Sequence, residues 1–113
     1  MHFTLTGRHI EITESMRQYA QEKSVKLARF YDRLESIDVI LDREPTKFRI
    51  EMVARADHRH TFVAQVDADD FYETVDLVTD KLEAQLRRHK EKVRNRKHAG
   101  KGEEDAAAEG QEP

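Results

Sequence analysis

Positively charged side chains concentrate in the last third of the sequence, where they could bind phosphate groups. From Lys81 to Lys101 there are nine lysines and arginines against two glutamates, whereas the whole chain has a net charge of −3. The segment from Gly102 to Pro113 has five acids and no base. Cations that neutralise phosphates release counterions without reading bases. The pattern favours a nucleic-acid backbone as ligand, with a merely solvated helix or a protein or membrane surface as alternatives.

The spacing of these cations predicts stripes on two helices. The last predicted helix has an apolar seam along one face. At 100° per residue, one border of this seam carries Lys81, Gln85, Arg88 and Lys92. The other border carries Arg87, Lys90, Arg94 and Lys97. The first predicted helix carries a further stripe beside its own apolar face, formed by Lys26, Arg29 and Arg33. Lys23 lies nearer to this apolar face. If both helices pack on one sheet, we expect the groove between them to be lined by cations.

The sequence contains no arrangement typical of catalysis or metal binding. The absence of cysteine excludes disulfides, a thiol nucleophile and a cysteine-based zinc site. His58 and His60 lie two residues apart but have only Asp57 nearby, which is a poor metal site. His89 lies on an apolar seam, so we interpret it as a packed or interfacial residue rather than a base. We therefore expect no catalysis, no metal and no cofactor.

Periodicity predicts six elements. The first strand covers His2–Thr6 and ends at Gly7, and Thr13 then caps a helix of about five turns. Its apolar positions are Met16, Ala20, Leu27, Phe30, Tyr31 and Leu34. Three strands follow, at Ser36–Glu44, Lys47–Ala56 and His60–Ala68. A short turn at Asp57–Arg59 joins the last two of them.

The last predicted helix begins at Asp69 or Asp70 and outgrows the sheet. One continuous apolar seam follows, formed by Phe71, Val75, Val78, Leu82, Leu86, His89 and Val93. A helix that reaches about Arg96 would measure roughly 40 Å, whereas seven-residue strands cover roughly 23 Å. Its basic end should therefore project beyond the strands.

The order β-α-β-β-β-α predicts an α+β two-layer sandwich. Four strands form an antiparallel-dominated sheet, and two helices cover one face. The expected domain covers residues 1–98, and the aperiodic residues 99–113 are expected to form a disordered acidic tail. The start of the sequence has no apolar leader, and no apolar run approaches a membrane span, so we expect a cytoplasmic protein.

Two segments give the sequence a family resemblance. They are "ITESMRQYAQEKSVKLARFYDRL" (Ile12–Leu34) and "DDFYETVDLVTDKLEAQLRRHKEK" (Asp69–Lys92). Both resemble the two helices of the short-form hibernation-promoting factor family, which includes ribosome-associated inhibitor A. The likeness covers about residues 1–97, with mild departures at Phe71 and Thr74–Asp76 that keep the apolar spacing.

The resemblance implies a fold like the double-stranded-RNA-binding domain with an added first strand. It also implies binding in the decoding channel of the small ribosomal subunit, where the protein would contact ribosomal RNA and block messenger and transfer RNA. A monomer off the ribosome, without membrane or small-molecule partners, is expected. The RNA-facing residues carried over are Lys23, Lys26, Arg29, Arg33, Lys81, Gln85, Arg88, Lys90 and Lys92. Tyr72 and Asp76 also match the family, and we interpret both as structural.

Several alternatives stay open at this point. The core resembles a branch that promotes paired, inactive ribosomes with a companion factor, whereas the acidic tail resembles a branch that opposes pairing. A general duplex-RNA-binding module would show the same cations. Small α+β sandwiches also include acylphosphatase-like hydrolases, but the segment Thr6–Thr13 offers Arg8 without the rest of a phosphate site.

Overall fold

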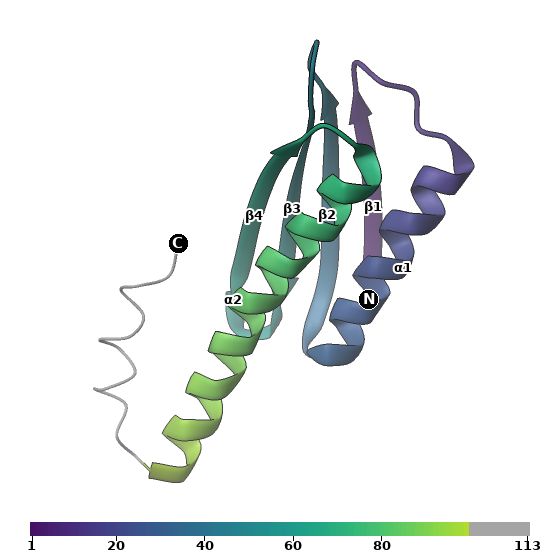
Figure 1. The fold of residues 1–113 in the computed structure, drawn as a ribbon. Coiled ribbons are helices and arrows are strands. Elements are labelled where there is room, and N and C mark those ends of the chain that lie inside the picture. The colour runs from purple at the N-terminus through teal and green to yellow at the C-terminus, as the bar shows by residue number, and fades with distance from the viewer. Residues whose placement is uncertain (100–113) are drawn as a thin grey trace.

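The computed structural model describes the backbone of residues 1–99 and the side chains of residues 1–94. Its elements are β1 (His2–Arg8), α1 (Glu14–Phe30), β2 (Leu34–Arg43), β3 (Phe48–Ala56), the short 3-10 turn η1 (Asp57–Arg59), β4 (Thr61–Ala68) and α2 (Phe71–Ala99). Both helices lie side by side on one face of a single sheet (Figure 1). The predicted order and the α+β two-layer sandwich are confirmed.

The sheet is mixed and has the order β1-β2-β3-β4. β1 and β2 are parallel, and α1 is the crossover that such a pair requires. The β2–β3 and β3–β4 pairs are antiparallel. The register places Val39 of β2 opposite Met52 of β3, and Met52 opposite Ala64 of β4. Every second residue of a strand points to the same face, so the apolar residues of these neighbouring strands share the face that the helices cover.

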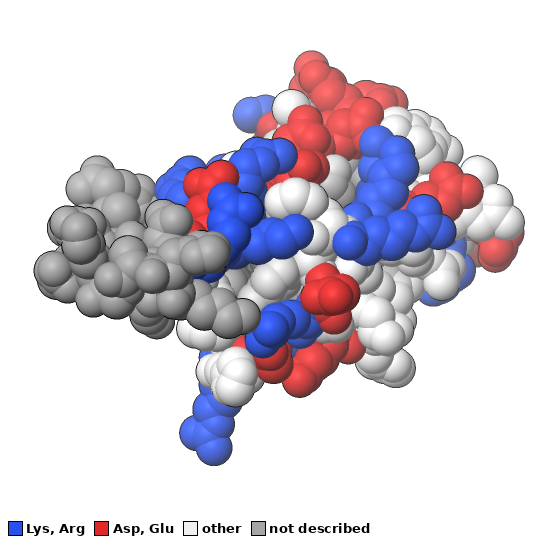
Figure 2. All heavy atoms as spheres, turned by 90° about the horizontal axis from the view of Figure 1, so that it is seen from below, with Lys and Arg blue, Asp and Glu red and all other residues white. Residues whose placement is uncertain are grey.

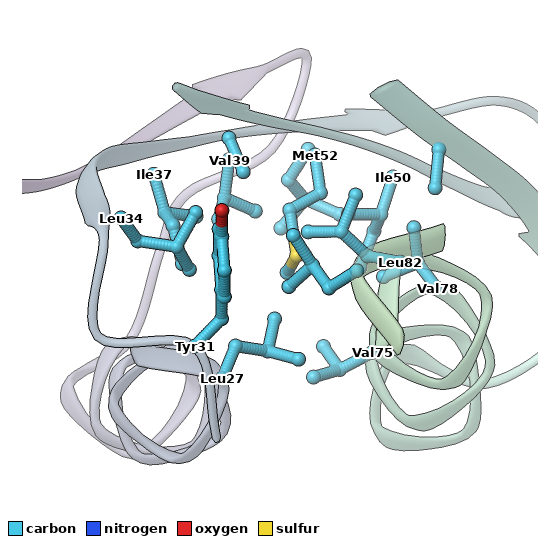
Figure 3. Close-up of a cluster of buried hydrophobic side chains, with 14 of the residues drawn as sticks. Leu27, Tyr31, Leu34, Ile37, Val39, Ile50, Met52, Val75, Val78 and Leu82 are labelled. Atoms are coloured by element: carbon cyan, nitrogen blue, oxygen red, sulfur yellow. The ribbon is translucent and has the colours of Figure 1, made fainter. Parts of the chain in front are cut away.

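The hydrophobic core fills the space between the sheet and both helices (Figure 3). The predicted seam of α2 supplies Phe71, Val75, Val78, Leu82 and Leu86, each at most 4% exposed. The seam then leaves the core, because Val93 is 38% exposed. The prediction that Val93 belongs to the buried seam is therefore wrong. At 29 residues α2 is roughly 44 Å long, and strands of 7 to 10 residues cannot accompany it to its end.

Several helix and strand boundaries differ from the prediction. α1 ends at Phe30 because Tyr31 is extended (φ −131°, ψ 97°), and Leu34 is the first residue of β2 rather than the last of the helix. β1 continues through Gly7 to Arg8, because both residues pair with β2. A Cβ at Gly7 would lie 2.9 Å from the Ile10 carbonyl oxygen, so glycine permits the close return of the loop.

The predicted helix starts are confirmed. Thr13 Oγ1 accepts a hydrogen bond from the Met16 amide at 3.2 Å. Asp70, rather than Asp69, caps α2, because its Oδ2 accepts from the Glu73 amide at 3.0 Å.

The predicted tail of residues 99–113 lies outside the described residues apart from Ala99, the last residue of α2. Among the helices of residues 1–99, none is both long and apolar enough to cross a membrane.

Candidate nucleic-acid interface

The flank of α2 that faces β4 carries the first predicted stripe. Within residues 1–99, β4 is an edge strand, so its outward carbonyls face no neighbouring strand there. Lys81 Nζ donates to the Gln65 carbonyl at 3.2 Å, and Gln85 Nε2 donates to the Val63 carbonyl at 2.9 Å. These two side chains therefore cover the free edge of the sheet. A neutral carbonyl does not cancel an ammonium charge, so Lys81 still contributes a positive potential here.

Arg88 and Lys92 continue this flank beyond Gln85, at helical spacings of three and four residues. They follow Leu86, the last fully buried position of α2 among residues 71–94. The flank thus passes from covering the sheet edge to the projecting part of the helix.

The opposite flank of α2 faces α1 and carries the second stripe. Lys90 Nζ donates to the Phe30 carbonyl at 2.9 Å and lies 4.6 Å from the centre of the Phe30 ring. The Arg87 guanidinium is 5.6 Å from the same ring and also pairs with Glu83 at 2.8 Å. The last residue of α1 is therefore held between two cations of α2.

A hollow of about 210 Å³ lies next to this contact, below the end of α1. Arg33 reaches it from the α1–β2 connection, and Lys90 and Arg94 reach it from α2. Tyr31, Asp32 and Val93 complete its walls. Three cations against one carboxylate make this hollow positive, although Arg33 also pairs with Asp57 at 3.1 Å.

The groove nearer the start of α2 has a different charge. Lys23 and Lys26 face Asp80 and Glu83 across a hollow of about 430 Å³. The expectation of a groove lined only by cations is therefore wrong for this half. Periodicity gives the position of charges on each helix, but not which border of α2 turns towards α1.

A part-buried network lies beside this neutral half of the groove. Tyr19 Oη donates to Asp76 at 2.7 Å, and Lys23 Nζ lies 3.3 Å from the same carboxylate. The hydrogen bond from Tyr19, together with the bond and charge of Lys23, lowers the pKa of Asp76. The same bond is the largest cause that raises the pKa of Tyr19. Tyr72 stacks edge-to-face on Tyr19 at 4.9 Å, so these contacts support the structural interpretation of both Tyr72 and Asp76.

The predicted RNA-facing residues fall into separate groups. Lys26 and Arg29 line a shallow, exposed face of α1. Arg33 and Lys90 come together, joined by Arg94, which was not among the carried-over residues. The stripe from Lys81 to Lys92 lies on the far flank of α2 and does not meet α1. Figure 2 shows the end from which α2 projects, where blue groups of Lys and Arg alternate with acidic side chains.

The histidines at this end form a packed cluster. The His89 ring contacts His60 at 4.3 Å, Phe62 at 5.2 Å and Tyr31 at 5.7 Å, which confirms its interpretation as a packed residue. Within residues whose side chains are described, no three potential metal ligands come together.

Comparisons with known proteins give the same fold and identify relatives. Residues 3–94 match the family described as sigma 54 modulation protein / S30EA ribosomal protein. A ribosome hibernation promoting factor from Azotobacter vinelandii is 36% identical over 92 residues, which cover 81% of this chain and 85% of the relative. The protein of the same name from Escherichia coli K12 is 30% identical over 94 residues, covering 83% and 98%.

Two solved structures have the same arrangement. The first is a ribosomal subunit interface protein from Coxiella burnetii, with a TM-score of 0.75, 30% identity, and coverage of 80% of this chain and 98% of the other. The second is the N-terminal domain of Protein Y from Thermus thermophilus, with a TM-score of 0.72, 30% identity, and coverage of 79% and 99%. The resemblance found in the two helices is thereby confirmed, and the chain belongs to the sigma 54 modulation protein / S30EA ribosomal protein family, alongside the short ribosome hibernation promoting factors.

Proposed function

We propose that this protein is a hibernation factor that binds the ribosome and inhibits translation without catalysing a reaction. The names of its relatives support ribosome binding. The observation that carries the proposal is the projecting part of α2, which presents cations on both flanks after the apolar seam ends. A helix that extends past the sheet can enter a space between RNA segments and neutralise phosphates on two sides.

The finer proposal is that the protein occupies the decoding channel of the small subunit and excludes messenger and transfer RNA. Folded RNA presents closely spaced phosphates in a fixed shape, and a protein can bind these by shape and charge without reading a sequence. Lys81, Arg88 and Lys92 would face RNA on one flank of α2. Lys90 would do so on the other.

Lys26, Arg29 and Arg33 stay predicted contacts of α1. Lys23 is the weakest of the predicted contacts, because Asp76 neutralises much of its charge. Gln85, which has no charge and binds an edge carbonyl, would contribute mainly by holding the helix in place.

Co-sedimentation with purified small subunits tests the proposal. The wild-type protein should pellet with the subunits. It should not pellet with subunits to which messenger and transfer RNA have been bound beforehand. The variant Arg88→Ala should bind more weakly and shallow the slope of log affinity against log salt by about one unit. Arg17→Ala is the matched control, because it removes an exposed arginine from the opposite end of the molecule.

The alternative of a general duplex-binding module predicts a different result in the same assay. In that case an isolated RNA duplex should compete as well as the small subunit does. We expect the duplex to compete poorly, and we expect no hydrolysis of acyl phosphates. A version without residues 99–113 should show whether the acidic segment alters binding or the pairing of ribosomes.

A further inference from the structure

Two consecutive residues at the tip of the β3–β4 hairpin have left-handed backbone conformations although neither is glycine. His58 has φ 58° and ψ 27°, and Arg59 has φ 65°. The Cβ atom of a residue other than glycine crowds the backbone in this region. Hairpins whose two tip residues are both left-handed therefore favour Asn-Gly or Asp-Gly. The chain thus accepts backbone strain here and gains two large side chains at the tip.

The other described residue of this kind has a local explanation. His9 has φ 62°, and its imidazole hydrogen-bonds Asp42 at 3.0 Å. Arg59 has no recorded ion pair or hydrogen bond of its side chain within residues 1–94. His58 has only the adjacent Asp57 at 3.7 Å, and its side chain is 77% exposed. Contacts among the side chains of residues 1–94 therefore do not explain why His58 and Arg59 occupy strained backbone positions.

The tip is held firmly on both sides. The Asp57 amide donates to the Arg33 carbonyl at 3.2 Å, and Asp57 Oδ2 accepts from Arg33 Nη1 at 3.1 Å. The Ala56 amide donates to the His60 carbonyl at 2.8 Å, and the His60 ring contacts His89 of α2 at 4.3 Å. Anchors on the α1–β2 connection and on α2 therefore fix the direction in which the tip points.

The tip lies at the end of the sheet from which α2 projects (Figure 1). The contact of His60 with His89 places it beside the part of α2 that carries Lys90 and Arg94. The exposed residue Arg59 thus adds a further cation to the end of the molecule from which α2 projects.

We propose that His58 and Arg59 form a second RNA-contacting element, in which Arg59 binds a backbone phosphate beside the one reached by α2. The inference rests on the proposed function, since the ligand is the same folded RNA. The planar guanidinium matches phosphate oxygens with two parallel hydrogen bonds, which a lysine cannot reproduce. Strain at a functional position is stable when the surroundings enforce it, and the two anchors of this tip do so.

Glycine at the tip separates the strain from the contact. The variants Arg59→Gly and His58→Gly/Arg59→Gly keep the left-handed backbone conformation but remove its strain, so the melting temperature should stay equal or rise by a few degrees. Their affinity for purified small subunits should fall about 5- to 10-fold, with a salt slope that is shallower by about one unit. Arg59→Asn, which tolerates this backbone conformation, should lose the same affinity, and Arg59→Lys should lose less.

The outcomes distinguish the two proposals. If the wild-type protein binds small subunits and the glycine variants bind equally well with the same salt slope, the tip is no RNA contact and the proposed function stands. If the wild-type protein itself does not bind, both proposals fail. A loss of affinity that accompanies a lowered melting temperature in both Arg59→Gly and Arg59→Asn would also overturn the inference, because the side chain would then be structural.

Discussion

Lys23 and Lys90 occupy the two halves of the same helix–helix contact, but their charges have different fates. Lys23 lies 3.3 Å from the Asp76 carboxylate, so the pair is close to neutral. Lys90 donates to the uncharged Phe30 carbonyl at 2.9 Å and keeps its full positive charge. Both lysines join α1 to α2, but only the second can also attract a polyanion.

The same distinction separates the two ends of the groove. Asp76, Asp80 and Glu83 face the first half, where α2 still packs on the sheet. Arg33, Lys90 and Arg94 gather in the second half, where the helix leaves it. A count of lysines and arginines along the sequence does not separate these groups, because it omits the acids that approach from another element.

The largest expected effect lies at the boundary between the two halves, at Leu86, after which no position of α2 up to Arg94 is fully buried. Leu86→Ala should lower the free energy of unfolding by about 2–5 kcal/mol, because it leaves a cavity in the core. Val93→Ala, about two turns further on at a position that is 38% exposed, should change it by less than about 0.5 kcal/mol. Urea denaturation followed by circular dichroism compares the two. Equal losses would mean that the seam continues past the sheet.

The next largest effect concerns binding by the positive half. Lys90→Glu/Arg94→Glu reverses two charges that form no ion pair within residues 1–94 and outnumber the one carboxylate, Asp32, that lines their hollow, so affinity for small subunits should fall at least about 30-fold at low salt. Sedimentation at equal protein concentrations measures the loss. An unchanged affinity in this double variant, with an intact circular dichroism spectrum, would remove the α1-facing flank from the RNA surface.

A smaller effect is expected from the neutral half, in the pH dependence of stability. The hydrogen bond from Tyr19 lowers the pKa of Asp76 in the folded state, so its contribution is present above the ordinary pKa of about 3.9 and is lost as pH falls through the lowered value. Because the Asp76 side chain is 45% exposed and solvent screens the interaction, Asp76→Asn should cost only about 0.5–1 kcal/mol at pH 7, and less in acid. Thermal melts at pH 7 and pH 3 test this. A constant difference between variant and wild type at both pH values would contradict it.

The smallest effect is expected at the edge of β4. Lys81→Ala/Gln85→Ala frees the Gln65 and Val63 carbonyls, each of which loses an exposed hydrogen bond. Stability should fall by only about 1 kcal/mol. Self-association should increase at high protein concentration, because an uncovered edge strand can pair with another chain. Analytical ultracentrifugation measures this, and a strictly monomeric variant would show that the two side chains do not protect the edge.

Much of the fold could be predicted from the sequence, because hydrophobic periodicity and helix caps are local signals. The α2 seam from Phe71 to Leu86 and the Thr13 cap are examples. Periodicity alone assigns Leu34 to the wrong element, because its spacing also continues the α1 pattern. The extended conformation of Tyr31, which ends the helix, has no glycine or proline to signal it.

The site was less predictable, because it depends on which elements become neighbours. The helical pattern placed Arg94 on a stripe, but only the packing of α2 beside α1 brings it to Arg33 and Lys90. The strained tip at Arg59 carries no sequence signal beyond the unusual absence of glycine in a short turn. Charge neutralisation of Lys23 by Asp76 likewise joins residues that are far apart in the chain.

Our central claim is that Lys90 and Arg94, which form no ion pair with a carboxylate within residues 1–94, contribute affinity for RNA, whereas the Lys23–Asp76 pair does not. The most direct test compares the salt dependence of small-subunit binding for two double variants. Lys90→Ala/Arg94→Ala should shallow the slope of log affinity against log salt by nearly two units, whereas Lys23→Met/Asp76→Asn should leave it unchanged. Equal slopes for both variants, or a larger change in the second, would contradict the account.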